Sequence, residues 1–368
     1  MAIPTISRHL VGGGDETRAF TKFVDPPSEP DRTLDRVAPN VRITRHIGEN
    51  FDMPLPFRLP NGKNKLRMWV IADPSKPMTF PSPLVRLRAG QAMHAAASTA
   101  RGEHTIHWHG IEPTPLNDGV GKHSFEIKGA YTYQWTPRQP GFFFYHCHVN
   151  TPLHFEMGLL GGLIVDPARG QGWVVAANAP DNLVRYDTEA IWITSAHDPR
   201  WHELSADHAQ HPLDAQGRDV INPNTPAGFT TTGILNDWRP SVFTISGAVA
   251  RDGSTPITDT RAAVSARVGQ TVLVRLLNAS YAIGEYRLGA DVQVIAQDGH
   301  PFGVPPVHAY SAPYTIPANR PFRLTTGQRY DLLLRPTSPG TIPFSVDYLD
   351  WRGYGSRGGA RTTITVRA

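Results

Sequence analysis

Short segments in which apolar and polar residues alternate recur along most of the chain. In L-V-R-L-R at 84–88 and Y-T-Y-Q-W at 131–135, the alternation has the period of two that a half-buried β-strand shows. Thirty-four prolines and thirty-three glycines supply turns between such segments. Other short β-rich segments stand at 67–73, 142–145, 162–166, 190–194, 242–246, 271–277, 292–296, 330–335 and 362–366. The pattern predicts an all-β protein.

The length of 368 residues suits two domains. Residues 1–40 are punctuated by prolines and glycines and have no persistent period, so we expect an extended N-terminal arm. Two β-rich blocks follow at 41–168 and 187–368, and a segment containing Pro, Gly and Asn links them. An insertion at 196–232 contains four histidines that are most simply solvated loop residues, with a shared metal site as the alternative: His197, His202, His208 and His211.

The two blocks resemble an internal repeat. V-R-L-R-A-G-Q at 85–91 matches V-S-A-R-V-G-Q at 264–270 with an offset of 179 residues, and T-P-R-Q-P-G at 136–141 matches R-P-T-S-P-G at 335–340 with an offset of 199. Without gaps, these offsets set the histidine motifs of the first block on other residue types: His104 on Ile283, His107 on Tyr286, His109 on Leu288, and His146, Cys147 and His148 on Ser345, Val346 and Asp347. We therefore expect the second block to be a metal-free copy of the first.

Composition and charge narrow the function classes. The net charge is +4 and the basic residues are scattered, so we expect no nucleic acid partner and no binding to an anionic membrane. No apolar run approaches the ~20 residues of a membrane span, and the first residues show no apolar core of a signal peptide. A single cysteine cannot form an intrachain disulfide.

Two histidine runs carry the candidate chemistry. G-E-H-T-I-H-W-H-G at 102–110 and H-C-H-V-N-T-P-L-H at 146–154 contain, together with His123 between them, seven of the sixteen histidines and the only cysteine. Single histidines in β-proteins are often hydrogen-bonded structural residues, and a lone cysteine is often an inert buried thiol. The density of these two runs favours metal ligands instead.

The H-C-H motif divides its side chains between two sites. Because successive residues of a strand point to opposite faces, His146 and His148 share one side and Cys147 faces the other. Cys147 with His154 and one more imidazole makes a set that suits a blue-copper electron-transfer centre.

The H-W-H motif contributes to the second of these sites. His107 and His109 share a side across Trp108 for the same geometric reason. With the outer histidines of H-C-H they make an all-imidazole group that suits copper or zinc: His107, His109, His146 and His148.

Together, H-x-x-H-x-H-G and the later H-C-H run resemble the copper-binding domain of the multicopper oxidases, the laccase-like family. I-H-W-H-G-I, N-D-G-V and, in the second block, T-T-G-Q-R-Y-D-L-L-L agree with it. The resemblance covers about residues 60–368 and implies two cupredoxin-like Greek-key β-sandwich domains, with copper in the first, and an oxidoreductase. The implied ligands are His104, Cys147 and His154 for type 1 copper, His107 for type 2 copper, and His109, His146 and His148 for the type 3 pair.

Leu159 takes the axial position beside type 1 copper by this resemblance. A non-ligating axial residue should raise the copper potential, because no thioether stabilises the oxidised ion. Met157 is the weaker axial candidate, since three residues after His154 an extended strand would turn it to the other face, although a turn could bring it inward.

The sequence departs from the family in two places. The loop between Cys147 and His154 is two residues longer than is usual in laccases. The oxygen-reducing cluster of the family takes eight histidines from two cupredoxin domains, and this chain supplies four. One chain therefore cannot build the standard cluster.

Three arrangements remain open. Two chains meeting about a two-fold axis could supply eight histidines and reduce oxygen. Alternatively, a single type 2 copper could be completed by His300 or His308 of a neighbouring chain, as in the similar two-domain copper nitrite reductases. In the third arrangement the chain is a type 1 copper electron carrier or copper-binding protein without catalysis. We expect a homo-oligomer, either dimer or trimer, and a small-molecule or protein electron donor.

Three residues near the motifs have weaker assignments. Asp118 could relay protons to oxygen as a general acid or could be a turn residue before Gly119. Glu156 and Met157 could form the rim at which a donor docks or could be ordinary exposed loop residues. The family resemblance implies a periplasmic or extracellular location, and the sequence names no substrate.

Overall fold

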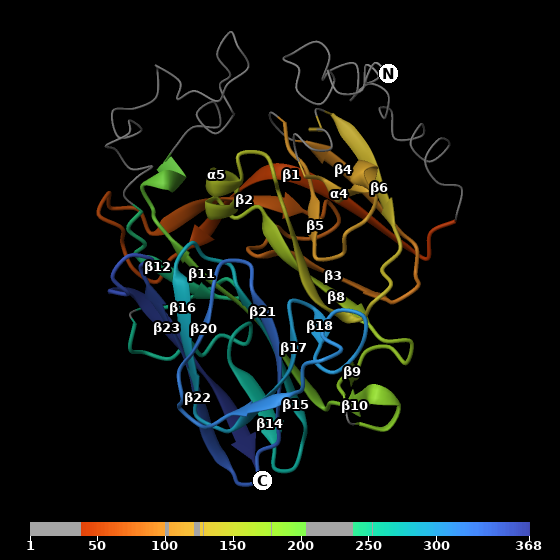
Figure 1. Cartoon of the computed structure of the whole chain (residues 1–368). Helices are drawn as coiled ribbons and strands as arrows, with labels where there is room; N and C mark the ends of the chain where they lie inside the picture. Colours follow the sequence, from red (N-terminus) through yellow and green to blue (C-terminus); the bar gives the residue numbers. More distant parts are fainter. Residues whose placement is uncertain are drawn as a thin grey trace.

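A computed structural model describes residues 38–99, 103–120, 126–127, 129–177, 179–203, 238–251 and 253–368. The expected N-terminal arm at 1–40 lies almost entirely outside these residues, as do His123, His208 and His211. The fold is all-β and cupredoxin-like, as expected (Figure 1).

The first half is a sandwich of two four-stranded sheets that enclose a common apolar core. One sheet has the order β2-β1-β4-β6: β2 (Lys65–Ala72), β1 (Val41–Pro54), β4 (Met93–Thr99) and β6 (Ala130–Trp135). The other has the order β3-β8-β7-β5: β3 (Ser82–Arg88), β8 (Leu160–Asp166), β7 (Gly141–His146) and β5 (His107–His109). Two short helices, α4 (Pro115–Asp118) and α5 (Thr151–Glu156), interrupt the strands.

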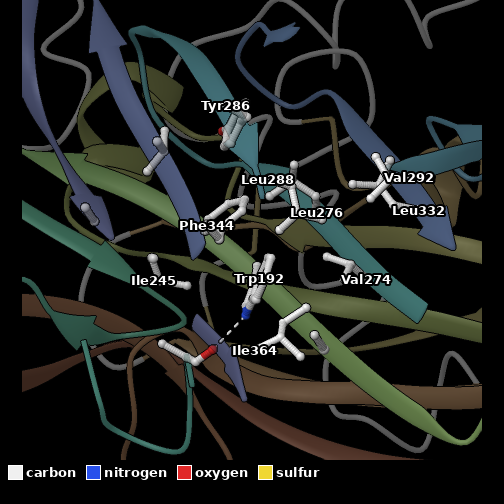
Figure 2. Packing of buried hydrophobic residues seen from close by; sticks show 14 of the residues in the cluster. Trp192, Ile245, Val274, Leu276, Tyr286, Leu288, Val292, Leu332, Phe344 and Ile364 are labelled. Carbon is white, nitrogen blue, oxygen red and sulfur yellow. Dashed lines mark hydrogen bonds between the residues drawn. The ribbon is translucent and has the colours of Figure 1, made fainter. Parts of the chain in front are cut away.

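The second half contains an eight-stranded and a five-stranded sheet. The larger sheet comprises β11 (Thr188–His197), β12 (Val242–Ile245), β13 (Ala248–Val249), β15 (Val272–Asn278), β17 (Val292–Gln297), β18 (His300–Pro301), β19 (Tyr314–Ile316) and β21 (Arg329–Leu334). The smaller comprises β14 (Val264–Arg267), β16 (Ile283–Leu288), β20 (Phe322–Leu324), β22 (Gly340–Leu349) and β23 (Ser356–Arg367). Figure 2 shows Trp192, Tyr286 and Phe344 in the core of the second half, where the Trp192 indole N–H donates to the carbonyl of Ala262 at 2.8 Å.

The segment between the halves is more ordered than the sequence suggested. It contains a small antiparallel pair, β9 (Trp173–Val175) with β10 (Leu183–Arg185), and a 3-10 turn at Pro180–Asn182. The strands before it lie within the range predicted for the first domain, and those after it within the range predicted for the second. The exact domain boundaries stay a prediction.

Matching hydrogen bonds support the internal repeat. In the first half the amide of Gly90 donates to the carbonyl of Pro137 at 2.8 Å, and in the second half the amide of Gly269 donates to the carbonyl of Pro336 at the same distance. The strand pairings also correspond: β1 runs parallel to β4 as β11 does to β15, and β3 runs parallel to β8 as β14 does to β23. The turns and the sheet order are therefore repeated together.

The comparison without gaps is wrong by one residue at the histidine positions of β5. His107 lies opposite His146 in the β5–β7 register, and the residue opposite Ser345 in the β16–β22 register is Arg287. Arg287, and not Tyr286, is therefore the counterpart of His107, because the second half has one additional residue before this strand. The conclusion that the second half lacks the corresponding histidine is unchanged.

The expectation that residues 131–135 form a half-buried strand was wrong, because both faces of β6 are covered. Helix α4 lies against this strand: the backbone amide of Gln134 donates to Oδ1 of Asn117 at 2.6 Å, and the Tyr131 hydroxyl donates to the carbonyl of Leu116 at 2.7 Å. The alternation at 84–88 is confirmed, since Val85 and Leu87 are buried and Leu84 and Arg88 are exposed.

Apolar and charged contacts join the two halves. A cluster of buried side chains includes Phe142 and Phe144 from β7 together with Leu277 from β15. Beside it, the Arg86 guanidinium lies 2.9 Å from the carboxylate of Glu189, so β3 and β11 are connected by a largely buried ion pair. The histidines on β5 and β7 consequently face a second half that is held in place.

Candidate metal centres

The thiol group, defined as His104, Cys147 and His154, is brought together as expected. Nδ1 of His154 lies 3.2 Å from Sγ of Cys147, and Nδ1 of His104 lies 3.5 Å from it. The three side chains come from separate pieces of chain: His104 forms an isolated bridge with Ile127, Cys147 follows β7, and His154 lies on α5. All three are buried.

The donor set of the thiol group fits a copper ion. Two imidazole nitrogens and one sulfur converge in a dry setting, which is the ligand type of blue-copper centres. Burial raises the pKa of the Cys147 thiol to about 12, so the thiol is protonated in the absence of a metal. A metal ion that binds the thiolate must therefore displace a proton.

His154 lies on a helix and not on an extended strand. Helix α5 is contacted by the second half, because the Tyr281 hydroxyl lies 3.0 Å from the carbonyl of Thr151 and 2.6 Å from that of Pro152.

Because His154 lies on a helix, the strand-based argument against Met157 does not hold: residues three apart on a helix are neighbours. Met157 and Leu159 are both fully buried in the cluster that contains Cys147, and the axial role of Leu159 stays a prediction.

The imidazole group, defined as His107, His109, His146 and His148, also assembles. Nδ1 of His109 lies 3.3 Å from Nε2 of His146. The ring centroid of His107 lies 5.4 Å from that of His109, 5.2 Å from that of His146 and 5.4 Å from that of His148. His107 and His109 therefore share a side, and His146 and His148 face them, as the alternation along the strands predicted.

Backbone carbonyls orient two of these rings. The Nδ1–H of His107 donates to the carbonyl of Asp118 at 2.8 Å, and the Nδ1–H of His146 donates to the carbonyl of Cys147 at 2.8 Å. In both rings Nε2 is left as the metal-binding atom, which is the arrangement usual for metal-ligating histidines. Oδ1 of Asp118 lies 3.4 Å from Nδ1 of His107, so the carboxylate stands beside the ring that its own carbonyl holds.

Two rings of the imidazole group, those of His109 and His146, are neutral at ordinary pH. Burial and the charge of Arg329 lower the pKa of His109 to about 2. Burial, reinforced by His107, lowers the pKa of His146 to about 3. A neutral ring is the form that binds a metal ion, so these two ligands need no deprotonation.

A pocket of about 520 Å³ opens beside the imidazole group, between the two halves. His107, His109 and Asp118 line it from the first half, and His300 and Arg329 line it from the second. His300 begins the short strand β18, directly after a turn at 298–299, and its Nδ1 contacts the Gln139 side chain at 2.8 Å. It lines this pocket within the same chain. The sequence had offered His300 only as a ligand from a neighbouring chain.

Arg329 is a pocket residue that sequence reasoning missed. Its guanidinium is buried, lies 5.3 Å from the Phe144 ring centroid and donates to the carbonyl of Gly327 at 2.7 Å. The sequence contained a signal for this residue: Arg329 begins the strand segment R-Y-D-L-L-L, and a charged residue in a buried sheet needs a specific partner or role.

Four other assignments are corrected by burial. Glu156 and Met157 cannot form an exposed docking rim, because 3% and 0% of their surfaces are exposed. His197 and His202 are not solvated loop residues: they belong to β11 and to a 3-10 turn at Trp201–Glu203, and both are buried. Burial lowers the pKa of His197 to about 3.

Comparison with known proteins agrees with the expected family. The family model described as multicopper oxidase matches residues 60–170. An L-ascorbate oxidase from Cucurbita pepo var. melopepo is 36% identical over 25% of this chain and 18% of its own length. Copper resistance protein A from Pseudomonas syringae pv. tomato is 25% identical over 78% of this chain and 46% of its own length, so the matched part spans less than half of either relative.

The fold comparison covers more of the chain. The crystal structure of a blue copper oxidase from Nitrosomonas europaea superposes with a TM-score of 0.61 at 20% identity, over 89% of this chain and 86% of that one. Copper, the expected cofactor, agrees with the matched multicopper oxidase family model and suits both donor sets described above. Among the described residues there is no helix long and apolar enough to cross a membrane.

Proposed function

From the match of residues 60–170 to the multicopper oxidase family model, we propose that the chain is a copper-dependent oxidoreductase. In this proposal single electrons from a small-molecule or protein donor enter at the thiol group and reach the imidazole group, where oxygen is reduced. The observation that carries it is the tripeptide at which the groups meet: Cys147 belongs to the thiol group, and His146 and His148 on either side of it belong to the imidazole group.

Bound copper would supply the one-electron change that this reaction needs. The residues of the chain would bind, orient and shield it. His104 and His154 direct Nδ1 at the sulfur of Cys147 in a buried cluster from which water is excluded. Leu159, the proposed axial neighbour, offers no donor atom, so it would favour the reduced ion and raise the potential.

Asp118 would act at the pocket. Its carbonyl fixes the ring of His107, and its carboxylate lines the pocket into which a small acceptor would enter. A carboxylic acid at that place could deliver protons to oxygen as it is reduced. We propose this general-acid role for Asp118.

The imidazole group provides half of the eight histidines that the family uses. We propose that a homo-oligomer completes it, with two first halves meeting about a two-fold axis and supplying four histidines each. One observation favours a second candidate, in which a single copper reduces an anion such as nitrite: the cationic Arg329 lines the pocket beside His107 and His109.

The test is the variant His107→Ala in copper-loaded protein. Loss of a ligand from the imidazole group should abolish oxygen consumption, whereas the blue colour of the thiol group should remain. His46→Gln, which changes a histidine on β1 outside both groups, is the matched control. Unchanged oxygen consumption in His107→Ala would contradict the proposal.

Copper content separates the candidates. Five coppers per dimer would support the oxygen-reducing cluster shared between chains, and two per chain would support the nitrite-reducing candidate. One per chain in a protein that consumes neither acceptor would leave an electron carrier. Cys147→Ser should remove the blue colour in every case. A periplasmic or extracellular location is part of the proposal and can be tested by cell fractionation.

A further inference from the structure

A third cluster of metal-ligating side chains lies beside helix α5 and shares no residue with the thiol or imidazole groups. Glu156 at the end of α5, His197 at the end of β11 and His202 in the turn at Trp201–Glu203 place ligand atoms within 4.8 Å of one another. The exposed fractions of these three residues are 3%, 1% and 3%. Helix α5 and the segment 197–203, which are about forty residues apart in the sequence, therefore bring two imidazoles and a carboxylate to one buried place.

Both imidazoles have the orientation of metal ligands. The Nδ1–H of His197 donates to the carbonyl of Glu156 at 3.1 Å, and the Nδ1–H of His202 donates to the carbonyl of Arg67 at 2.7 Å. With the proton fixed on Nδ1, the lone pair of each ring is on Nε2. Metal-binding histidines usually donate their other ring nitrogen to a carbonyl or carboxylate in this way.

Nε2 of His202 is the atom that most clearly points to a ligand. It is buried, and among the described residues no hydrogen-bond partner reaches it. Oε1 of Glu156 stands 3.6 Å away, which is too far for a hydrogen bond. A buried nitrogen left without a partner is costly, so an ion between these two atoms would be stabilising.

The surroundings hold the other two ligands in position. The Glu156 carboxylate accepts the amide N–H of Asp198 at 2.6 Å and the indole N–H of Trp238 at 3.1 Å, which leaves further lone pairs on both oxygens. Nε2 of His197 lies 2.9 Å from the Ser195 hydroxyl, and that hydroxyl also contacts the Thr244 hydroxyl at 2.7 Å. Ser195 can therefore keep a partner if His197 turns to a metal ion.

We propose that Glu156, His197 and His202 bind one divalent ion of the zinc type. Two imidazoles and one carboxylate are a known ligand set for Zn²⁺ and leave one position for a water molecule. The ion would join helix α5 of the first half to the segment 197–203 of the second half. It would act as a structural tie beside the helix that supplies His154.

The experiment uses the full chain, first saturated with copper and then dialysed against Co²⁺ as a coloured substitute for Zn²⁺. Wild-type protein should take up one Co²⁺ per chain with the blue colour unchanged. His202→Gln, whose amide can still donate to the Arg67 carbonyl, should lose this Co²⁺ or bind it at least about tenfold more weakly. His46→Gln should bind it as wild type does. Equal uptake by His202→Gln and wild type, or no uptake by wild type, would overturn the proposal.

A second measurement uses only wild-type protein, so its result does not depend on whether a variant folds. X-ray absorption at the zinc edge of wild-type protein loaded with copper and then Zn²⁺ should report two imidazoles and oxygen ligands. A sulfur ligand would place the zinc at Cys147, and a set of three or four imidazoles would place it in the imidazole group. Either result would contradict the proposed site, whatever the outcome for oxygen consumption.

Discussion

Arg287 and Asp347 form an ion pair at the positions that His107 and His148 take in the first half. Nη1 of Arg287 lies 3.5 Å from Oδ2 of Asp347, and Nη2 of Arg287 lies 2.7 Å from Oε1 of Glu285. A guanidinium at this place repels a metal cation and occupies the carboxylates that could otherwise bind one. The second half therefore keeps the strand pairing of the first and has paired charges where the first has His107 and His148.

Arg287→Gln should change little. The exposed fractions of the Arg287 and Asp347 side chains are 39% and 26%, and solvent-accessible pairs of this kind contribute about 0 to 1 kcal/mol. We expect a loss of free energy of unfolding within that range in denaturant titrations, with the copper content unchanged. A loss of copper in Arg287→Gln would show that this half takes part in metal binding.

Asp118→Asn separates a proton relay from a turn residue. The backbone carbonyl, which the substitution keeps, holds His107, so copper content should remain that of wild type. If the carboxyl group delivers protons, oxygen consumption should fall about 100- to 10,000-fold. The measurement is the rate of oxygen uptake with copper analysis on the same sample, and a wild-type rate would assign Asp118 to the turn alone.

The ion pair between the halves predicts a loss of stability in acid. Burial opposes ionisation of Glu189, but hydrogen bonds and charge from Arg86 and Arg275 hold its pKa below the ordinary 4.5. The pair therefore contributes its full stability above about pH 4.5, and this contribution is lost as the pH falls through the lower pKa of the folded state. Glu189→Gln should lower the melting temperature at pH 7, and its difference from wild type should shrink below pH 4.5. A difference that is constant with pH would contradict this.

Gly141→Ala should weaken the contact between the halves. A Cβ at this position would lie 2.0 Å from the carbonyl oxygen of Gly299, which is backbone and cannot rotate away. The forced separation should cost about 1 to 3 kcal/mol of unfolding free energy. Gly353→Ala is the control, because a Cβ there meets no atom within 4 Å. Equal stability of the two variants would argue against a tight contact.

Much of the fold and both groups in the first half could be predicted from short-range patterns. The period of two in L-V-R-L-R identified β3, and the same alternation across Cys147 separated the thiol from His146. These features depend on neighbours in sequence, which strand geometry relates to one another directly.

Features that depend on distant segments could not be predicted in this way. His202 looks like a loop histidine until the carbonyl of Arg67 on β2 accepts its Nδ1–H, and Gln134 looks solvent-facing, yet it is buried and its backbone amide is bonded to Asn117 of α4. The extra residue before Arg287 is also invisible in a comparison without gaps, because only the β16–β22 register reveals it. In each case the deciding contact comes from elsewhere in the chain.

The hydroxyl of Tyr281, in the second half, contacts the carbonyls of Thr151 and Pro152 in the first half. The first half therefore depends on the second for a contact that it would lose if the two were separated. The first half contains every side chain of the thiol and imidazole groups, yet the helix that carries His154 is held by a tyrosine from the second. A fragment ending before the second half would keep all the donor atoms of both groups, but it would lose the Tyr281 contact that holds the helix carrying His154. The half without those donors thus serves as scaffolding for the half that has them.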